Sequence, residues 1–567
     1  MKNNDSNTWK HPHNRQELLR QALVQSMGYT KEDLDKPIIG IINTWGETNP
    51  GHYHFRQLSE AVKRGVWANG GFPLEVNALS ICECFFDVSS MMYRNLLAME
   101  TEELAARHPF DGIVLIGGCD KDTPGLLMGA CSVNKPTIYL PGGAMLPGSY
   151  KGETLCCGTD TFKIYNRYIS GELTWDEMMD RAGCLYGSVG ACPIMGTANS
   201  GQIMTEALGI ALPGTSTSLG LSAEKNRQAE YTGRRIVDMV KEDLKIRDII
   251  TPESVRNAIR LIMACGCSTN LMIHLKAIMH RCGFDMDLME FDRISNDTPL
   301  LVNCKPHGTN PVGAELHNAG GVPAIMKELR DKLNLSVVTC TGKNLGENLE
   351  GVDDAYNRDV IKSSGNPIKE VGGIAVLKGN LAPDGAVIKR SAATERLLKM
   401  RGPAKVFDNL KDAEKWLADP NSPMTWDTVI VLRGYGPTGE PGMSEFGNYL
   451  PVPPVLFKNG ITDYLRVTDS RMSGGCYGSV ILHVSPESNL GGPLAAIRDG
   501  DIIHVDVDKN LIEVELSDEE IKERLKGFKR NTHPEIKRGY IRMFIDHISQ
   551  ASDGCDFDFL EYQEEDK

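Results

Sequence analysis

Residues 112–118 (GIVLIGG) form a short apolar run that ends directly in Cys119-Asp120-Lys121, and the residues 122–125 (DTPG) follow at once. A run of this length is typical of a buried strand, after which a helix is expected to begin. In open α/β sheets, ligands bind at the edge where the strands end. Thiolates favour iron or zinc and carboxylates favour magnesium or manganese, so this turn offers ligands of both kinds. The alternative interpretation is a buried cysteine followed by an Asp/Lys surface pair.

The same alternation of apolar runs and amphipathic segments extends over the N-terminal part of the chain. Buried strands are expected at residues 37–43, 74–79, 112–116 and 137–140, and helices at 55–69, at 91–107 and after Thr123. This order predicts a parallel sheet that is covered by helices on both faces. From residue 161 to 329 the pattern is mainly helical, with helices expected at 201–208, 226–244 and 252–282.

The pattern changes towards the C-terminus. Residues 342–365 are polar and turn-rich and are expected to form a linker. Short β segments separated by Gly/Pro turns follow, at residues 373–377, 386–389, 404–407, 428–432, 464–468, 480–484 and 502–516, with a hairpin that turns at Asp508-Lys509-Asn510. Such spacing is typical of a β-barrel or sandwich. The sequence therefore predicts an α/β domain at residues 1–370 and a barrel-like, mostly β domain at 371–567.

Composition narrows the class of protein. The 567 residues are 41% hydrophobic and 24% charged, as in ordinary globular proteins, and the net charge of −14 argues against nucleic-acid or anionic-membrane partners. No apolar run approaches the ~18 residues of a membrane span, and the polar N-terminus lacks a signal peptide, so a cytoplasmic location is expected. Fifteen cysteines are too dilute for a disulfide scaffold and predict free thiols or metal ligands. Any single one of them is more often a core residue.

Four further stretches carry residues with chemical potential. They are residues 80–85 (SICECF) with Glu83, 187–201 (GSVGACPIMGTANSG) with Cys192, 434–447 (GYGPTGEPGMSEFG) with Glu440 and Glu445, and 469–478 (DSRMSGGCYG) with Ser473. Each alone is more often a structural glycine-rich turn, because glycine permits backbone conformations that other residues avoid.

Considered together, these stretches offer two kinds of metal ligand. Glu83, Asp120 and Glu445 are hard oxygen ligands of the kind that Mg²⁺ takes, and Cys119 and Cys192 are soft ligands suited to an iron–sulfur cluster. Such a pair of Lewis acids suits the removal of water from a polyhydroxy acid. The hard ion would chelate the carboxylate and the 2-hydroxyl, and the cluster iron would bind the 3-hydroxyl as leaving group.

Five motifs occur in an order that resembles the dihydroxyacid dehydratase/6-phosphogluconate dehydratase family. They are GGCDKDTPG, GACPIMGTANS, GCSTN (266–270), GPTGEPGMSE and DSRMSGGCYG. The resemblance extends from the strand expected at residue 37 to the hairpin after residue 500. Within the family, residues 91–96 (MMYRNL) and Thr44-Trp45 are more similar to the sugar-acid (aldonate) dehydratases than to the branched-chain biosynthetic enzymes. The family's fold, an α/β domain and a β-barrel domain with the site between them, agrees with the pattern above.

The resemblance implies a role for each candidate residue. Cys119 and Cys192 correspond to cluster ligands, and Glu83, Asp120 and Glu445 correspond to Mg²⁺ ligands. Lys121 matches a lysine that is carbamylated in members of the family, which would make it an anionic metal ligand. Ser473 matches the serine that works as an alkoxide base on C2, a role that requires a nearby metal to lower its pKa. The family also implies a homodimer or homotetramer.

The chain departs from the family at Gly51. Members with a [2Fe–2S] cluster carry a cysteine there, whereas some relatives, including ones with a [4Fe–4S] cluster, share the Pro-Gly-His sequence, so the cluster type stays open. The candidates for the missing ligand are Cys82, Cys84, Cys184, Cys476, His52 and His54. For the histidines, a hydrogen-bonded turn residue is the favoured alternative. Cys476 is a second departure, because many relatives have a threonine near the base.

The resulting hypothesis is a hydro-lyase that dehydrates an aldonic acid, such as a pentonate or hexonate, to a 2-keto-3-deoxy acid. The alternatives are a dihydroxyacid dehydratase of branched-chain amino-acid biosynthesis, which needs a more apolar pocket, and a non-catalytic iron–sulfur or sugar-acid sensor.

Overall fold

The computed structural model describes residues 13–156, 158–169, 171–446 and 450–560. Near the N-terminus, four parallel strands form a sheet of order β2-β1-β3-β4. Their bounds are Ile38–Asn43 (β1), Phe72–Asn77 (β2), Gly112–Gly117 (β3) and Thr137–Pro141 (β4). Every residue of β1, β3 and β4 is buried, as expected for apolar strands covered on both faces. The predicted parallel sheet is confirmed.

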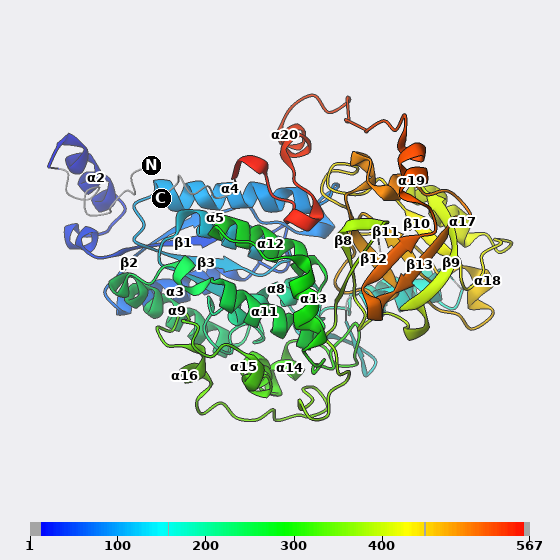
Figure 1. Ribbon diagram of the computed structural model, residues 1–567. Coiled ribbons are helices and arrows are strands. Elements are labelled where there is room, and N and C mark those ends of the chain that lie inside the picture. The colour runs from blue at the N-terminus through cyan, green and yellow to red at the C-terminus, as the bar shows by residue number, and fades with distance from the viewer. Residues whose placement is uncertain (1–12, 157, 170, 447–449, 561–567) are drawn as a thin grey trace.

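Helices cover both faces of this sheet (Figure 1). One face carries α3 (Phe55–Ala68) and α9 (Ala223–Glu242), and the other carries α4 (Met91–Arg107) and α5 (Asp122–Val133). The helices α3 and α9 approach closely at two glycines. A Cβ on Gly65 would lie 1.9 Å from the Glu230 carbonyl oxygen, and one on Gly233 would lie 2.1 Å from that of Val62. Only glycine permits backbone contact at this crossing.

The helix predicted over residues 252–282 is two helices, α11 (Pro252–Cys265) and α12 (Asn270–Cys282). The chain turns at Gly266, whose φ of 60° is left-handed and ends α11. The segment between them leads into the site described below. Before α11, the helix α8 spans Thr197–Ala207 and is buried over most of its length.

The expectation of a linker at residues 342–365 is wrong. The helix α16 (Leu345–Leu349) lies within it, and Leu345, Leu349, Val360 and Ile361 are buried in the core of the N-terminal layers. Polar turns between these apolar residues concealed their periodicity. The domain boundary near residue 370 stays a prediction.

The C-terminal part contains a closed barrel of order β10-β11-β12-β8-β7-β14-β13-β9. Its strands are Ala375–Gly379 (β7), Ala382–Ile388 (β8), Lys399–Phe407 (β9), Val429–Leu432 (β10), Arg466–Thr468 (β11), Val480–Ser485 (β12), Ile502–Asp506 (β13) and Leu511–Val514 (β14). The parallel neighbours β9 and β10 are joined by the crossover helix α17 (Leu410–Ala418). The predicted hairpin is confirmed, with Asn510 left-handed at its turn. Closure leaves no unpaired edge.

After the barrel, the chain returns to the N-terminal layers. Helices α19 (Asp518–Leu525) and α20 (Tyr540–His547) lead to residues 551–556, which pack beside α4 and α12 (Figure 1). Arg94 of α4 donates to the Gly554 carbonyl at 3.0 Å, and Arg281 of α12 forms an ion pair with Asp556 at 2.6 Å.

The remaining elements are short or peripheral. They are α2 (Arg15–Ser26), α6 (Thr159–Ile169), α7 (Trp175–Ala182), α10 (Ile246–Ile249), α13 (Leu288–Asn296), α14 (Ala314–Asn318), α15 (Gly321–Glu328), α18 (Pro454–Phe457), and the pair β5 (Gly148–Tyr150) and β6 (Glu153–Leu155). Within the described ranges, no helix has both the length and the apolar character to cross a bilayer.

Candidate active site

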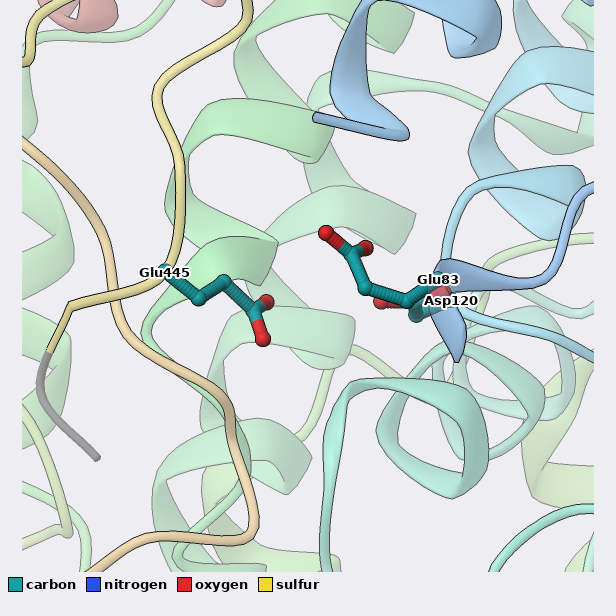
Figure 2. A group of neighbouring side chains, drawn as sticks. All are labelled: Glu83, Asp120 and Glu445. Carbon is teal, nitrogen blue, oxygen red and sulfur yellow. The ribbon is translucent and has the colours of Figure 1, made fainter. Parts of the chain in front are cut away.

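Three carboxylates from distant parts of the chain meet at the carboxyl edge of the parallel sheet. Glu83 begins a short 3₁₀ turn after β2, Asp120 follows β3, and Glu445 lies in the loop after β10. One oxygen of each lies within 4.8 Å of the others. Figure 2 shows Glu83 and Asp120 together on one side, with Glu445 pointing at them from the other. The structure thus brings together the residues that the sequence analysis assigned to Mg²⁺.

Two buried cations contact these carboxylates. The Lys121 ammonium lies 3.2 Å from Glu83 and also contacts Asp120. The Arg471 guanidinium lies 3.3 Å from Glu83 and also contacts Glu445. Glu445 and Arg471 are held opposite each other by a bridge between their loops. Three carboxylates against two cations leave one negative charge in excess, so the site has the charge and the hard oxygen donors to take a divalent cation such as Mg²⁺.

The pKa values of the two glutamates reflect their positions in this cluster. Burial raises the pKa of Glu83, but the positive charges of Lys121 and Arg471 lower it by more than burial raises it. The net pKa of Glu83 therefore lies below the ordinary value. Burial also raises the pKa of Glu445, and Arg471 offsets only part of this effect while Glu83 adds to it, so the net pKa lies above the ordinary value. The negative charge of Glu445 is therefore less compensated than that of Glu83.

Asn270 connects the loop of Glu445 to the loop of Ser473. It begins α12 and is buried. Its amide nitrogen donates to Glu445 Oε1 at 3.3 Å, to the Met472 carbonyl at 3.2 Å and to Thr197 Oγ1 at 3.1 Å. Its motif, GCSTN, is one of those that carry the family resemblance, but the sequence predicted no role for Asn270. The available signal was an amide side chain directly after a turn-like Gly-Cys-Ser-Thr sequence.

Ser473 lies half-buried in a tight turn between β11 and β12. The turn requires glycine next to it, since a Cβ on Gly474 would lie 2.6 Å from Ser268. Below the turn, the buried Lys389 ammonium donates to the Gly474 carbonyl at 3.2 Å. Burial lowers the pKa of Lys389 to about 8. Sequence reasoning missed this lysine because it continues the apolar strand run AVIK, where only its charge was a signal.

Cys119 and Cys192 are both half-buried. Cys119 follows β3, and Cys192 lies in the loop before α8, where it packs with Cys156 and Ile194. Burial raises the pKa of Cys119 well above its ordinary value, and the nearby Asp120, Asp122 and Cys192 raise it further. Two adjacent half-buried thiols fit the donor type that an iron–sulfur cluster requires.

Comparison with known proteins agrees with this arrangement. The chain matches the N-terminal dihydroxy-acid/6-phosphogluconate dehydratase domain over residues 36–348 and the C-terminal domain of the same name over residues 359–555. The chain belongs to the dihydroxy-acid/6-phosphogluconate dehydratase family. It is therefore a dehydratase, and the expected family and two-part fold are confirmed.

Relatives in this family act on different acids. The chain is 41% identical to 6-deoxy-6-sulfo-D-gluconate dehydratase of Pseudomonas putida and 41% identical to L-arabinonate dehydratase of Rhizobium leguminosarum, each over 98% of this chain and 96% of the relative. It is 40% identical to dihydroxy-acid dehydratase of Acetivibrio thermocellus, over 94% of this chain and 96% of the relative. Overall identity does not separate the two substrate classes.

Gly51, at the position where the resemblance implies a cysteine in [2Fe–2S] members, is buried in a turn. A Cβ there would lie 3.0 Å from Asn49 Oδ1 and 3.5 Å from the Gly190 carbonyl oxygen. His52 uses both ring nitrogens: Nδ1 donates to the Thr44 carbonyl at 2.7 Å, and Nε2 accepts from the Cys119 amide at 3.0 Å. The His54 Nε2 atom hydrogen-bonds the Gly142 carbonyl at 2.9 Å. Both histidines thus have the hydrogen-bonding role that the sequence analysis favoured.

Proposed function

We propose that this dehydratase removes water from an aldonic acid and releases a 2-keto-3-deoxy acid. The observation that carries the proposal is the polar character of the residues around the carboxylate cluster. Ser90 donates to Glu83, Asn270 donates to Glu445, and Thr197 and Ser268 share a hydrogen bond of 2.8 Å beside them. Hydroxyls and amides suit a polyhydroxylated substrate, whereas a branched aliphatic acid favours apolar contacts.

In this proposal, Glu83, Asp120 and Glu445 would hold Mg²⁺, and Cys119 and Cys192 would hold an iron–sulfur cluster. When bound, these groups supply Lewis acidity that acidifies the C2 proton and takes up the charge of the leaving 3-hydroxyl. Ser473 Oγ, as the alkoxide, would take the C2 proton and pass it to the departing 3-hydroxyl. The C3–O bond breaks as the C2–C3 double bond forms, water leaves, and the enol product tautomerises to the ketone.

Ser473 needs positive charge nearby, because a serine hydroxyl is a very weak acid. The Lys389 ammonium, bonded to the adjacent Gly474 carbonyl, supplies such a charge from within the protein. Asn270 holds the Ser473 turn through the Met472 carbonyl and holds Glu445 through its carboxylate, which fixes the base relative to the metal ligands.

Lys121 is the proposed site of carbamylation. The ammonium would first lose one proton; the neutral Nζ would then bond to the carbon of CO₂ with loss of a second proton, so that a cation becomes an anion. Two effects lower the pKa of Lys121, burial and Arg471, but the surrounding carboxylates outweigh them and the net pKa lies above the ordinary value. A bound divalent cation favours the anionic form, because it would repel the ammonium.

Parallel turnover measurements test the substrate class. We expect L-arabinonate, D-xylonate or 6-deoxy-6-sulfo-D-gluconate to react with kcat/KM at least about 100-fold above that of dihydroxyisovalerate, because unpaired buried polar groups discriminate strongly. Turnover of dihydroxyisovalerate alone would establish the branched-chain activity instead. Binding of sugar acids without turnover by metal-loaded protein would favour the sensor.

A further inference from the structure

The turn at residues 49–52 hydrogen-bonds to three loops, which carry Cys192, Cys119 and Cys82. The Gly190 amide, two residues before Cys192, donates to the Pro50 carbonyl at 3.2 Å. The Cys119 amide donates to His52 Nε2 at 3.0 Å. On the third side, Asn49 Nδ2 donates to the carbonyl of Ile81, the residue before Cys82, at 2.9 Å.

The side chain of Asn49 links residue 51 directly to the loop that carries Cys82. Its Oδ1 accepts from the Gly51 amide at 3.0 Å while its Nδ2 holds Ile81. The Ile81 amide in turn donates to Asp122 at 3.2 Å, at the start of the helix that follows Cys119. The backbone next to Cys82 is therefore hydrogen-bonded both to the turn at residues 49–52 and to the start of the helix that follows Cys119.

The other candidate ligands are placed less well. Cys84 is exposed and lies beyond Glu83, although its thiol is within hydrogen-bonding reach of Cys82. Cys184 packs in a separate apolar cluster with Leu155, Ile164 and Leu173. Cys476 is buried in the Ser473 turn, and His52 uses both ring nitrogens in hydrogen bonds. His54 follows the turn and is held through Nε2 by the Gly142 carbonyl, while its buried Nδ1 has no hydrogen-bond partner.

We propose that Cys82 supplies the third thiolate of an iron–sulfur cluster that is also held by Cys119 and Cys192. It would replace the cysteine that is absent at position 51, where this chain has glycine. The cluster is part of the proposed function, so this inference rests on it. The thiolate reaches the site from the loop that carries Glu83, which places a cluster ligand next to a metal ligand in the chain. Iron–sulfur clusters accept cysteines from separate loops provided that the sulfur atoms converge.

The test compares cluster content among variants purified and reconstituted without oxygen. Iron, sulfide, visible absorption and the EPR spectrum of the reduced protein are measured for wild type, Cys82→Ser, Cys84→Ser and Cys119→Ser. We expect wild type to hold about two or about four irons. We expect Cys82→Ser and Cys119→Ser to retain less than about one fifth of this iron, as a lost ligand weakens binding at least tenfold. Cys84→Ser, two residues away, should match wild type.

A rescue experiment separates ligation from folding. Gly51→Cys in the Cys82→Ser background should restore the iron content, because a Cβ at position 51 requires only a small shift of Asn49 and meets the Gly190 carbonyl at ordinary contact distance. Thermal unfolding shows whether each variant is folded. Full iron in Cys82→Ser, loss of iron in Cys84→Ser alone, or no rescue by Gly51→Cys would each overturn the assignment of Cys82. Sugar-acid turnover by iron-free wild type would overturn the cluster itself, whereas turnover by iron-loaded Cys82→Ser overturns only this inference.

Discussion

Two clusters of charged side chains join the N-terminal layers to the C-terminal part of the chain, and they differ in charge balance. The open cluster consists of Glu83, Asp120, Glu445, Lys121 and Arg471, with three carboxylates against two cations. The closed cluster consists of Arg94, Arg281, Glu102 and Asp556, with two charges of each sign. Both bring together residues more than 300 positions apart.

The two clusters also differ in how many of their carboxylates are exposed to solvent. In the closed cluster, Arg281 and Asp556 are each 1% exposed, and Arg281 makes further bonds to Glu102 and Ser132 at 2.8 Å. In the open cluster all three carboxylates are partly exposed, at 32% for Glu83, 15% for Asp120 and 11% for Glu445, whereas in the closed cluster Glu102 is exposed at its outer end, at 30%, and Asp556 is not. A buried, matched cluster leaves nothing for a ligand to complete, whereas an accessible cluster with excess negative charge leaves a place for a cation. The comparison predicts that one cluster serves stability and the other chemistry.

The largest expected effect is on turnover, at the base beside the open cluster. Replacing Ser473 with Ala should lower kcat by about 10²–10⁴-fold, because proton transfer by a positioned group contributes that much. Iron, Mg²⁺ and the unfolding midpoint should stay at wild-type values. A Ser473→Ala variant with full activity would remove the serine from the mechanism.

The closed cluster should control stability instead. Asp556→Ala should lower the free energy of unfolding by about 3–5 kcal/mol, since it leaves buried Arg281 without its main partner. Urea denaturation measures this change, and the folded fraction should keep its turnover. Asp558→Ala is the control, because its ion pair with His547 is exposed and such pairs contribute ~0–1 kcal/mol. Equal losses in both variants would contradict the proposed role of the closed cluster.

Mg²⁺ should stabilise the protein through the open cluster. At about 100 times its Kd, the ion should add about 2.7 kcal/mol to the free energy of unfolding, and chelation should remove this gain. Glu445→Gln should abolish the gain, whereas Glu440→Gln, in the same loop and bonded to Ser444, should retain it. Thermal melts with and without Mg²⁺ make the comparison. Retention of the full gain in Glu445→Gln would exclude that carboxylate as a ligand.

Asn270 should have a smaller effect, because it acts by positioning its neighbours. Asn270→Ala should weaken Mg²⁺ binding and lower kcat by about 10–100-fold, as is usual when a partner of a metal ligand is lost. Titration of activity with Mg²⁺ separates the two effects, and excess Mg²⁺ should restore part of the rate. An unchanged Mg²⁺ dependence would limit Asn270 to a structural role.

The smallest effect is a change in pH dependence. The pKa of Lys389 in the folded protein is about 8 because of burial, below the ordinary value, so its positive charge is lost as the pH rises past 8. Turnover should fall several-fold between about pH 7.5 and 9 in wild type, and this limb should be absent in Lys389→Met. The unfolded chain binds more protons than the folded one between about pH 8 and 10.4, so wild-type stability should rise relative to Lys389→Met over that range. A limb that persists in Lys389→Met would have another origin.

Much of the fold could be predicted because its signals are local. The apolar runs at β1 and β3 and the amphipathic periods of α3 and α4 identify their elements within a few residues. The break at Gly266 was missed because the helical period continues on both sides of it. The structure between residues 342 and 365 was missed because its few apolar residues are separated by polar turns.

By itself, the sequence determined which chemical groups are present and that several stand at strand ends or in glycine-rich turns: Cys119, Asp120, Cys192, Glu83, Glu445 and Ser473. Only the tertiary structure decided which of them meet. It placed Arg471 between Glu445 and Glu83 and linked the loops of Glu445 and Ser473 through Asn270. It also set Lys389 beneath the Ser473 turn and brought the C-terminal segment back onto α4 and α12. Side-chain type and local periodicity can be read from a few neighbouring residues, whereas distances between residues hundreds of positions apart depend on how the whole chain packs.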